Sequence, residues 1–235
     1  MPILNELQQF GKKILSWLWL FIAAFGFFFA FGVKEFEIFK KIQQDLLIKE
    51  MELIVTNPLD AVWAQIGISL FLAFVLTLPF LLYKLISFFS PALKTSEKKA
   101  ILKAILPSVA LFICGCIFAY YLLIPLTFKF LYPYVLAMGA KPFFAINQFI
   151  SMVLILILGT GLLFLLPIFM ILLSRFKIVS PDTWKKNWRY AVLASLVLTA
   201  IITPDGTGLT MMLLTLPMLL LYFLGWIGSK KLSKN

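Results

Sequence analysis

Six long stretches without a charged side chain constrain this sequence more than any other feature. All but the fifth reach the roughly 20 residues that an α-helix needs to cross about 30 Å of hydrocarbon. We therefore predict six transmembrane helices, at residues 14–33, 61–83, 104–128, 148–174, 190–204 and 207–228. The chain is then expected to be an all-α, polytopic membrane protein in which residues 1–235 form a single integral membrane domain.

The composition excludes a water-soluble globule. Hydrophobic residues make up 62% of the chain and charged residues 13%, whereas soluble domains contain roughly 45–50% and 25%. The 21 basic and 10 acidic residues are too few to cover a core of this size with a polar shell.

The net charge of +11 raises the question of nucleic-acid binding, but the cations lie between the apolar stretches. If the N-terminus is cytoplasmic, fifteen of the 21 basic residues fall in inner segments and six in outer ones. Cytoplasmic loops of membrane proteins carry this excess of lysine and arginine. We therefore predict that both termini are cytoplasmic and that nucleic acid is not a partner.

The fifth and sixth predicted spans are separated by residues 203–208, a cluster of turn formers around Asp205. A single helix here would bury a charge and contain Pro204 and two glycines. We predict a tight hairpin between two short helices, with local thinning of the bilayer or entry of water on the Asp205 side.

Two further features bear on shape. Residues 34–60 alternate charged and apolar side chains at roughly helical spacing, which favours an amphipathic helix on or near the outer surface over a solvated loop. Prolines also lie inside several spans, where each frees a backbone carbonyl and bends its helix. They are Pro79, Pro107, Pro125, Pro167 and Pro217.

The sequence offers no catalytic constellation. Histidine is absent, which excludes histidine-based triads and zinc sites, and Cys114 and Cys116 lie two apart in an apolar stretch, where we interpret them as packing residues. The first four spans contain no acidic or basic residue, although ion-coupled transporters usually need one. We expect no enzymatic activity, no cofactor and no metal.

Three acids, Glu6, Glu97 and Asp182, accompany the fifteen inner cations. Asp182 follows Ser180 and Pro181, as expected for the first turn of a helix. Glu97 has two interpretations that charge alone does not separate. It either neutralises neighbouring lysines or pairs with an incoming cation, which a guanidinium would do in a bidentate way.

Three segments carry a family resemblance: residues 76–99 with Pro79, Phe88, Pro91 and Glu97, residues 118–128 with Tyr120 and Pro125, and residues 178–217 with Asp205 and Pro217. In order and spacing they resemble the TatC family, the polytopic component of the twin-arginine protein translocase. The resemblance covers about residues 55–228, and six spans with both termini inside is also the topology of the family.

The resemblance implies that the chain binds twin-arginine signal peptides and nucleates the export of folded proteins, driven by the proton-motive force. It implies TatA- or TatB-like single-span partners in the bilayer, and a homo-oligomer within the receptor complex. Glu97 would accept an arginine of the signal, with Phe88 nearby and Glu6 as a second element. The residues expected to make structural or partner contacts are Pro79, Pro91, Tyr120, Pro125, Asp205 and Pro217.

The sequence departs from the family pattern at two places. Glu6-Leu7 is followed by Gln8-Gln9 where the family has an arginine-containing motif, and Leu165 stands where the family has a fourth-span glutamate. The alternative functions are a secondary transporter of a small solute and a membrane scaffold subunit. Because arginine occurs only twice and phenylalanine 25 times, a pattern typical of AT-rich organellar genomes, the mitochondrial inner membrane is favoured over a bacterial plasma membrane or a plastid thylakoid membrane.

Overall fold

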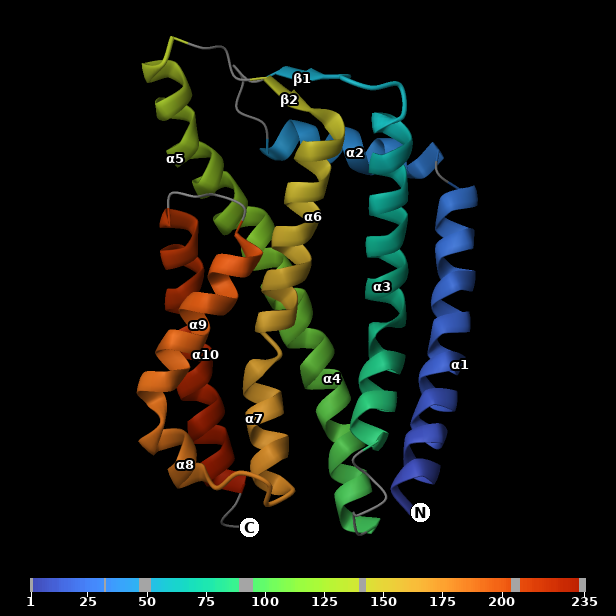
Figure 1. Ribbon diagram of the computed structural model, residues 1–235, viewed down its shortest axis with the longest axis vertical. Coiled ribbons are helices and arrows are strands. Elements are labelled where there is room, and N and C mark those ends of the chain that lie inside the picture. The colour runs from blue at the N-terminus through green and yellow to red at the C-terminus, as the bar shows by residue number, and fades with distance from the viewer. Residues whose placement is uncertain are drawn as a thin grey trace. The chain divides into compact units, whose positions relative to one another are not determined.

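Figure 1 shows the computed structural model of the chain, which is helical over most of its length. The structure describes residues 2–31, 33–46, 52–88, 95–139, 143–203 and 208–232, with the backbone alone at 2–14, 33–36, 85–88, 95–103, 209 and 232. The described helices are α1 (Pro2–Ala30), α2 (Val33–Leu46), α3 (Asp60–Phe88), α4 (Thr95–Phe118), η2 (Ala119–Leu123), α5 (Ile124–Ala137), α6 (Ile146–Leu163), α7 (Leu166–Arg175), α8 (Pro181–Lys186), α9 (Trp188–Ile202) and α10 (Leu209–Leu232).

The chain forms two compact units, which are described separately. The N-terminal unit contains residues 1–45 and 55–109, and the C-terminal unit contains residues 46–54 and 110–235. The C-terminal unit includes two short parallel strands, β1 (Glu52–Ile54) and β2 (Phe143–Ala145), with Leu53 opposite Phe144.

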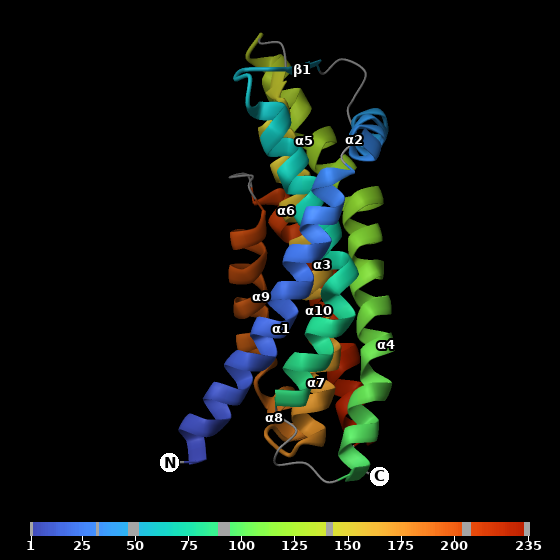
Figure 2. The same cartoon turned by 90° about the vertical axis from the view of Figure 1, so that its right-hand side faces the viewer.

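The N-terminal unit is built on α1 and α3, which lie side by side (Figures 1 and 2). The Gln65 side chain of α3 donates a hydrogen bond to the Phe29 carbonyl of α1 at 3.2 Å. The start of α3 is fixed by Asp60, whose carboxylate accepts hydrogen bonds from the Thr56 hydroxyl at 2.7 Å and from the Thr56 and Asn57 backbone N–H groups at 3.1 and 2.9 Å. The carboxylate thus reaches back to the residues before the helix, as the acid of a capping box does, and satisfies their backbone donors.

The C-terminal unit packs α10 against α7 and α9, and α5 with η2 against α6. Fully buried side chains mark the second of these contacts, among them Leu123, Ile124, Phe128, Phe149 and Val153. At the crossing of α4 and α6 a Cβ built on Gly115 would lie 2.9 Å from the Gly161 Cα. The two helices therefore approach so closely that neither position has room for a side chain.

Each of the six predicted spans overlaps a helical segment among the described residues. By length and composition, four segments among the described residues are long enough to cross a membrane: Asp60–Lys84, Ala104–Ala137, Ile146–Arg175 and Thr210–Lys231. Shorter apolar helices cover Leu15–Ala30 and Trp188–Ile202. The all-α, polytopic membrane fold predicted from the apolar stretches is confirmed.

The length of the last two helices differs from the expectation in one respect. The 15 residues of α9 rise about 22 Å, so this helix is short, as predicted. The prediction of a short sixth span is wrong, because α10 has 24 residues, which rise about 36 Å. The helices end and begin at Ile202 and Leu209, while the predicted turn around Asp205 lies outside the described residues.

The prolines act on their helices in different ways. Pro167 lies at the second position of α7, and the fourth predicted span is divided between α6 and α7 at Phe164 and Leu165. Pro125 follows the π-helical turn η2, in which the Ile124 N–H bonds to the Ala119 carbonyl five residues back. A proline has no N–H to donate, and π-turns absorb such interruptions. Pro79 and Pro217 lie within the continuous helices α3 and α10.

The described residues of the predicted amphipathic segment are partly helical and partly extended. Residues 33–46 form α2, whereas Glu52–Ile54 pair with β2 as strand β1. Paired strands satisfy their backbone groups with each other. The prediction of a helix is therefore wrong for residues 52–54.

Candidate functional site

The predicted signal-binding residues all belong to the N-terminal unit. Glu6 lies in α1, Phe88 is the last residue of α3 and Glu97 is the third residue of α4. Figures 1 and 2 show the start of α1, the end of α3 and the start of α4 at the same end of this unit. The side chains of these residues, and all of Pro91, lie outside what the structure describes, so the recognition contacts stay predictions.

The residues expected to serve structure or partner contacts are distributed over both units. Pro79 is half-buried in α3, and in the C-terminal unit Tyr120, Pro125 and Pro217 are half-buried in η2, α5 and α10. The structural or partner contacts of these side chains stay predictions. Asp205 lies outside the described residues.

Buried threonines connect the helices of the C-terminal unit. The hydroxyls of Thr127 (α5) and Thr210 (α10) are 3.1 Å apart, and those of Thr199 (α9) and Thr215 (α10) are 2.9 Å apart. Thr127, Thr199 and Thr215 also lie within hydrogen-bond distance of the carbonyl four residues earlier in their own helices. Because a hydroxyl has a single proton, each of them donates either to that carbonyl or to the paired threonine, but not to both. Polar pairs between membrane helices contribute about 0.6 kcal/mol each on average, so they fix helix register more than they raise stability.

No carboxylate supplements these hydroxyls in the fourth predicted span. Leu165, where the family resemblance implies a glutamate, is 3% exposed. Nearby in α6 the Thr160 hydroxyl is buried and has no hydrogen-bond partner among the described residues. Among the described residues, the buried polar side chains of the C-terminal unit are therefore those of threonine and serine.

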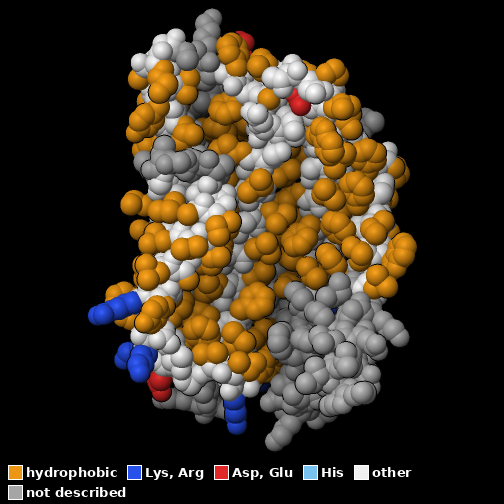
Figure 3. Space-filling model, in the orientation of Figure 1, with side chains coloured by type: hydrophobic (Ala, Val, Ile, Leu, Met, Phe, Trp, Pro, Cys, Tyr) orange, Lys and Arg blue, Asp and Glu red, His pale blue; other side chains and the backbone are white. Residues whose placement is uncertain are grey.

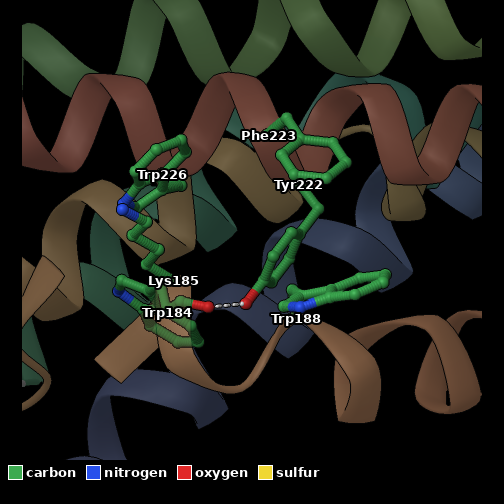
Figure 4. A pocket seen from close by; sticks show the side chains of 6 residues that line it. All are labelled: Trp184, Lys185, Trp188, Tyr222, Phe223 and Trp226. Carbon is green, nitrogen blue, oxygen red and sulfur yellow. Dashed lines mark hydrogen bonds between the residues drawn. The ribbon is translucent and has the colours of Figure 1, made fainter. Parts of the chain in front are cut away.

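One end of the C-terminal unit gathers aromatic side chains that the sequence analysis did not single out (Figure 4). The Tyr222 hydroxyl donates to the Trp184 carbonyl at 2.7 Å, and the Trp184 indole N–H donates to the Ser174 hydroxyl at 2.9 Å. These two bonds tie α7, α8 and α10 together. The sequence pattern that could have indicated this cluster is tryptophan and tyrosine beside lysines at the ends of apolar stretches, since such residues concentrate at membrane interfaces.

Two local predictions can be compared directly with the structure. Asp182 lies in the first turn of α8, and Ser180 caps this helix by accepting from the Thr183 N–H at 3.3 Å, which confirms the helix start. Cys114 and Cys116 are both free thiols, the first exposed and the second half-buried with its sulfur 3.8 Å from the Ile157 carbonyl oxygen.

Long apolar helices with polar groups paired inside and cations at their ends define a polytopic α-helical membrane protein. Within this class, residues 4–217 match the family model described as the Sec-independent protein translocase protein TatC. The chain belongs to the TatC family and is a subunit of the Sec-independent protein translocase, the receptor component of the twin-arginine translocase.

Individual relatives agree with this assignment over most of the chain. The chain is 32% identical to the TatC protein of Aquifex aeolicus, with 98% of this chain and 97% of the relative covered. It is 36% identical to an uncharacterized tatC-like protein, ycf43, of Trieres chinensis, covering 81% and 74%. The crystal structure of a twin-arginine translocase receptor TatC superposes with a TM-score of 0.82 at 31% identity, covering 98% of this chain and 99% of the other.

The comparisons confirm the family that the motifs predicted. They also bear on location, because the relatives include bacterial proteins and plastid-type ycf43 proteins. The chain is thus a multi-pass membrane protein, and the mitochondrial preference finds no support among these relatives.

Proposed function

We propose that this chain binds the twin-arginine signal peptides of folded proteins at the end of the N-terminal unit where α1 starts, and that this binding begins their export. The family match carries the proposal. The positions of Glu6, Phe88 and Glu97 at that same end support it. Two arginines need carboxylates, and Glu6 and Glu97 are two of the three acids on the predicted cytoplasmic side.

The partners that fit this function are TatA- and TatB-like single-span subunits, further copies of this chain and the surrounding lipid. Exposed apolar side chains on α9 and α10 support such contacts, including Leu193, Ile201, Met212 and Leu216. An apolar helix face in a membrane accepts another helix through close packing. The proton-motive force drives the transport in this proposal, and no covalent chemistry, catalytic residue, cofactor or nucleic acid takes part.

An export assay tests the function. A folded reporter with a twin-arginine signal is expressed in cells that lack their own TatC but contain the single-span partners. We expect the reporter to cross the membrane only when this chain is present, because the receptor brings cargo and partners together. The matched control carries a twin-lysine signal, which cannot form bidentate pairs, and export that ignores this change would contradict the proposal.

The topology follows from the same function. We propose one membrane domain with six spans, both termini in the cytoplasm and the connection between α9 and α10 outside. We infer that the membrane is a bacterial plasma membrane or a plastid thylakoid membrane, which the bacterial and plastid-type ycf43 relatives support over the mitochondrial inner membrane.

Labelling of introduced cysteines tests this topology. In a chain whose Cys114 and Cys116 are replaced by alanine, a cysteine at Thr207 should react with an impermeant maleimide added from outside, since the charge count places this connection there. A cysteine at Lys186 should react only after the membrane is opened. The reverse pattern would show that the orientation is inverted.

A further inference from the structure

An open pocket of about 320 Å³ lies at one end of the C-terminal unit, beside the Tyr222–Trp184 hydrogen bond (Figure 4). Its lining is almost entirely apolar and aromatic and comes from α8, α9 and α10. The lining residues are Trp184, Lys185, Trp188, Tyr222, Phe223 and Trp226.

The pocket lies where apolar helices give way to charged residues. The preceding apolar helix α7 ends at Arg175, α9 begins at Trp188, and the last turn of α10 contains Lys230 and Lys231. Three tryptophans and a tyrosine at this level match the depth that these side chains prefer in a bilayer, between the hydrocarbon and the headgroups. The pocket is therefore placed at a membrane interface.

Two walls of the pocket, Trp184 and Tyr222, are held in position before any ligand arrives. The rings of Trp184 and Tyr222 meet edge to face with centroids 6.3 Å apart, and the Tyr222 hydroxyl is fixed on the Trp184 carbonyl. Preorganised walls lower the entropy that a ligand must lose with the protein on binding.

The charge around the pocket is strongly positive. Exposed cations of this end are Arg175, Lys177, Lys185, Lys186, Arg189, Lys230 and Lys231, and Asp182 is the acid among them. Figure 3 shows basic side chains gathered at the lower end of this unit, below a surface of hydrophobic side chains. Lys185 is the cation in the lining itself, with its Nζ 5.9 Å from the Trp226 ring centroid.

We propose that this pocket binds one anionic phospholipid, with the phosphate on Lys185 and an acyl chain against the aromatic walls. This inference goes beyond the proposed export function and does not depend on it. The combination of one cation and an apolar lining matches a lipid better than a free phosphate. A free phosphate would contact only the lysine and would make no contact with the apolar walls. Basic pockets between membrane helices are known to favour such headgroups.

Lipid retention tests the proposal. The full chain, purified in detergent, is equilibrated with equal amounts of phosphatidylglycerol and phosphatidylcholine, washed, and its bound lipids are counted by native mass spectrometry. We expect one phosphatidylglycerol to be retained in preference to phosphatidylcholine. Lys185→Gln should lower that retention about fivefold, the effect of one basic residue near an anionic lipid.

The matched control is Lys186→Gln, which makes the same charge change on the neighbouring exposed residue outside the lining. It should retain most of the lipid. Phe223→Ala, which removes an apolar wall without changing charge, should lower retention as well. Glycerol 3-phosphate, the headgroup portion without acyl chains, should fail to displace the lipid at millimolar concentration.

Three results would overturn the proposal. Equal retention of the two lipids would remove the anionic preference, and equal losses in Lys185→Gln and Lys186→Gln would show a diffuse surface charge without a pocket. Displacement by glycerol 3-phosphate would show that the acyl chain contributes nothing.

Discussion

Replacing Glu97 with alanine is expected to abolish export of a folded protein that carries a twin-arginine signal. Removing one partner of a charge-assisted pair with a guanidinium costs roughly 2–5 kcal/mol, which weakens signal binding by at least about thirtyfold. The export assay described above, with signal binding measured separately on the purified receptor, checks both parts of this expectation.

Two variants separate the charge of Glu97 from its shape. Glu97→Gln keeps the size of the side chain and should fail nearly as completely as alanine, because a neutral amide cannot form the ion pair. Asp182→Ala removes another acid of the predicted cytoplasmic side, exposed on α8, and should leave export close to normal. Normal export by Glu97→Ala would withdraw the assignment of the site, while the family assignment would stand.

Replacing Gly115 with alanine should destabilise the C-terminal unit. The added Cβ would lie 2.8 Å from the Phe164 Cγ and 2.9 Å from the Gly161 Cα. The Gly161 contact is with backbone, so α4 and α6 would have to separate, and overpacking of this kind costs about 1–3 kcal/mol. Thermal unfolding of the purified chain in detergent should show a lower midpoint.

Gly26→Ala is the matched control, because the same substitution there meets nothing within 4 Å. Alanine favours a helix over glycine by roughly 0.5–1 kcal/mol, so this variant should be equally stable or slightly more stable. An unchanged midpoint for Gly115→Ala would mean that the two helices can move apart without loss.

Much of the candidate site could be predicted from the chain because its signals are local. Glu6 and Glu97 stand out as scarce acids in a basic field, and the segments around Pro79, Phe88 and Pro125 identify the family. The aromatic pocket could not be assembled in this way. Trp184 and Tyr222 are 38 residues apart, and no sequence pattern around either residue indicates that their side chains are in contact.

The sequence by itself determined the class of this protein, the position of its helices and the ends at which charge collects. These properties follow from hydropathy and charge along the chain, because a membrane selects each apolar stretch almost independently. Only the tertiary structure decided that Gly115 meets Gly161 and that Thr127 pairs with Thr210. Packing between helices depends on side-chain shape across large sequence separations, which no local pattern records.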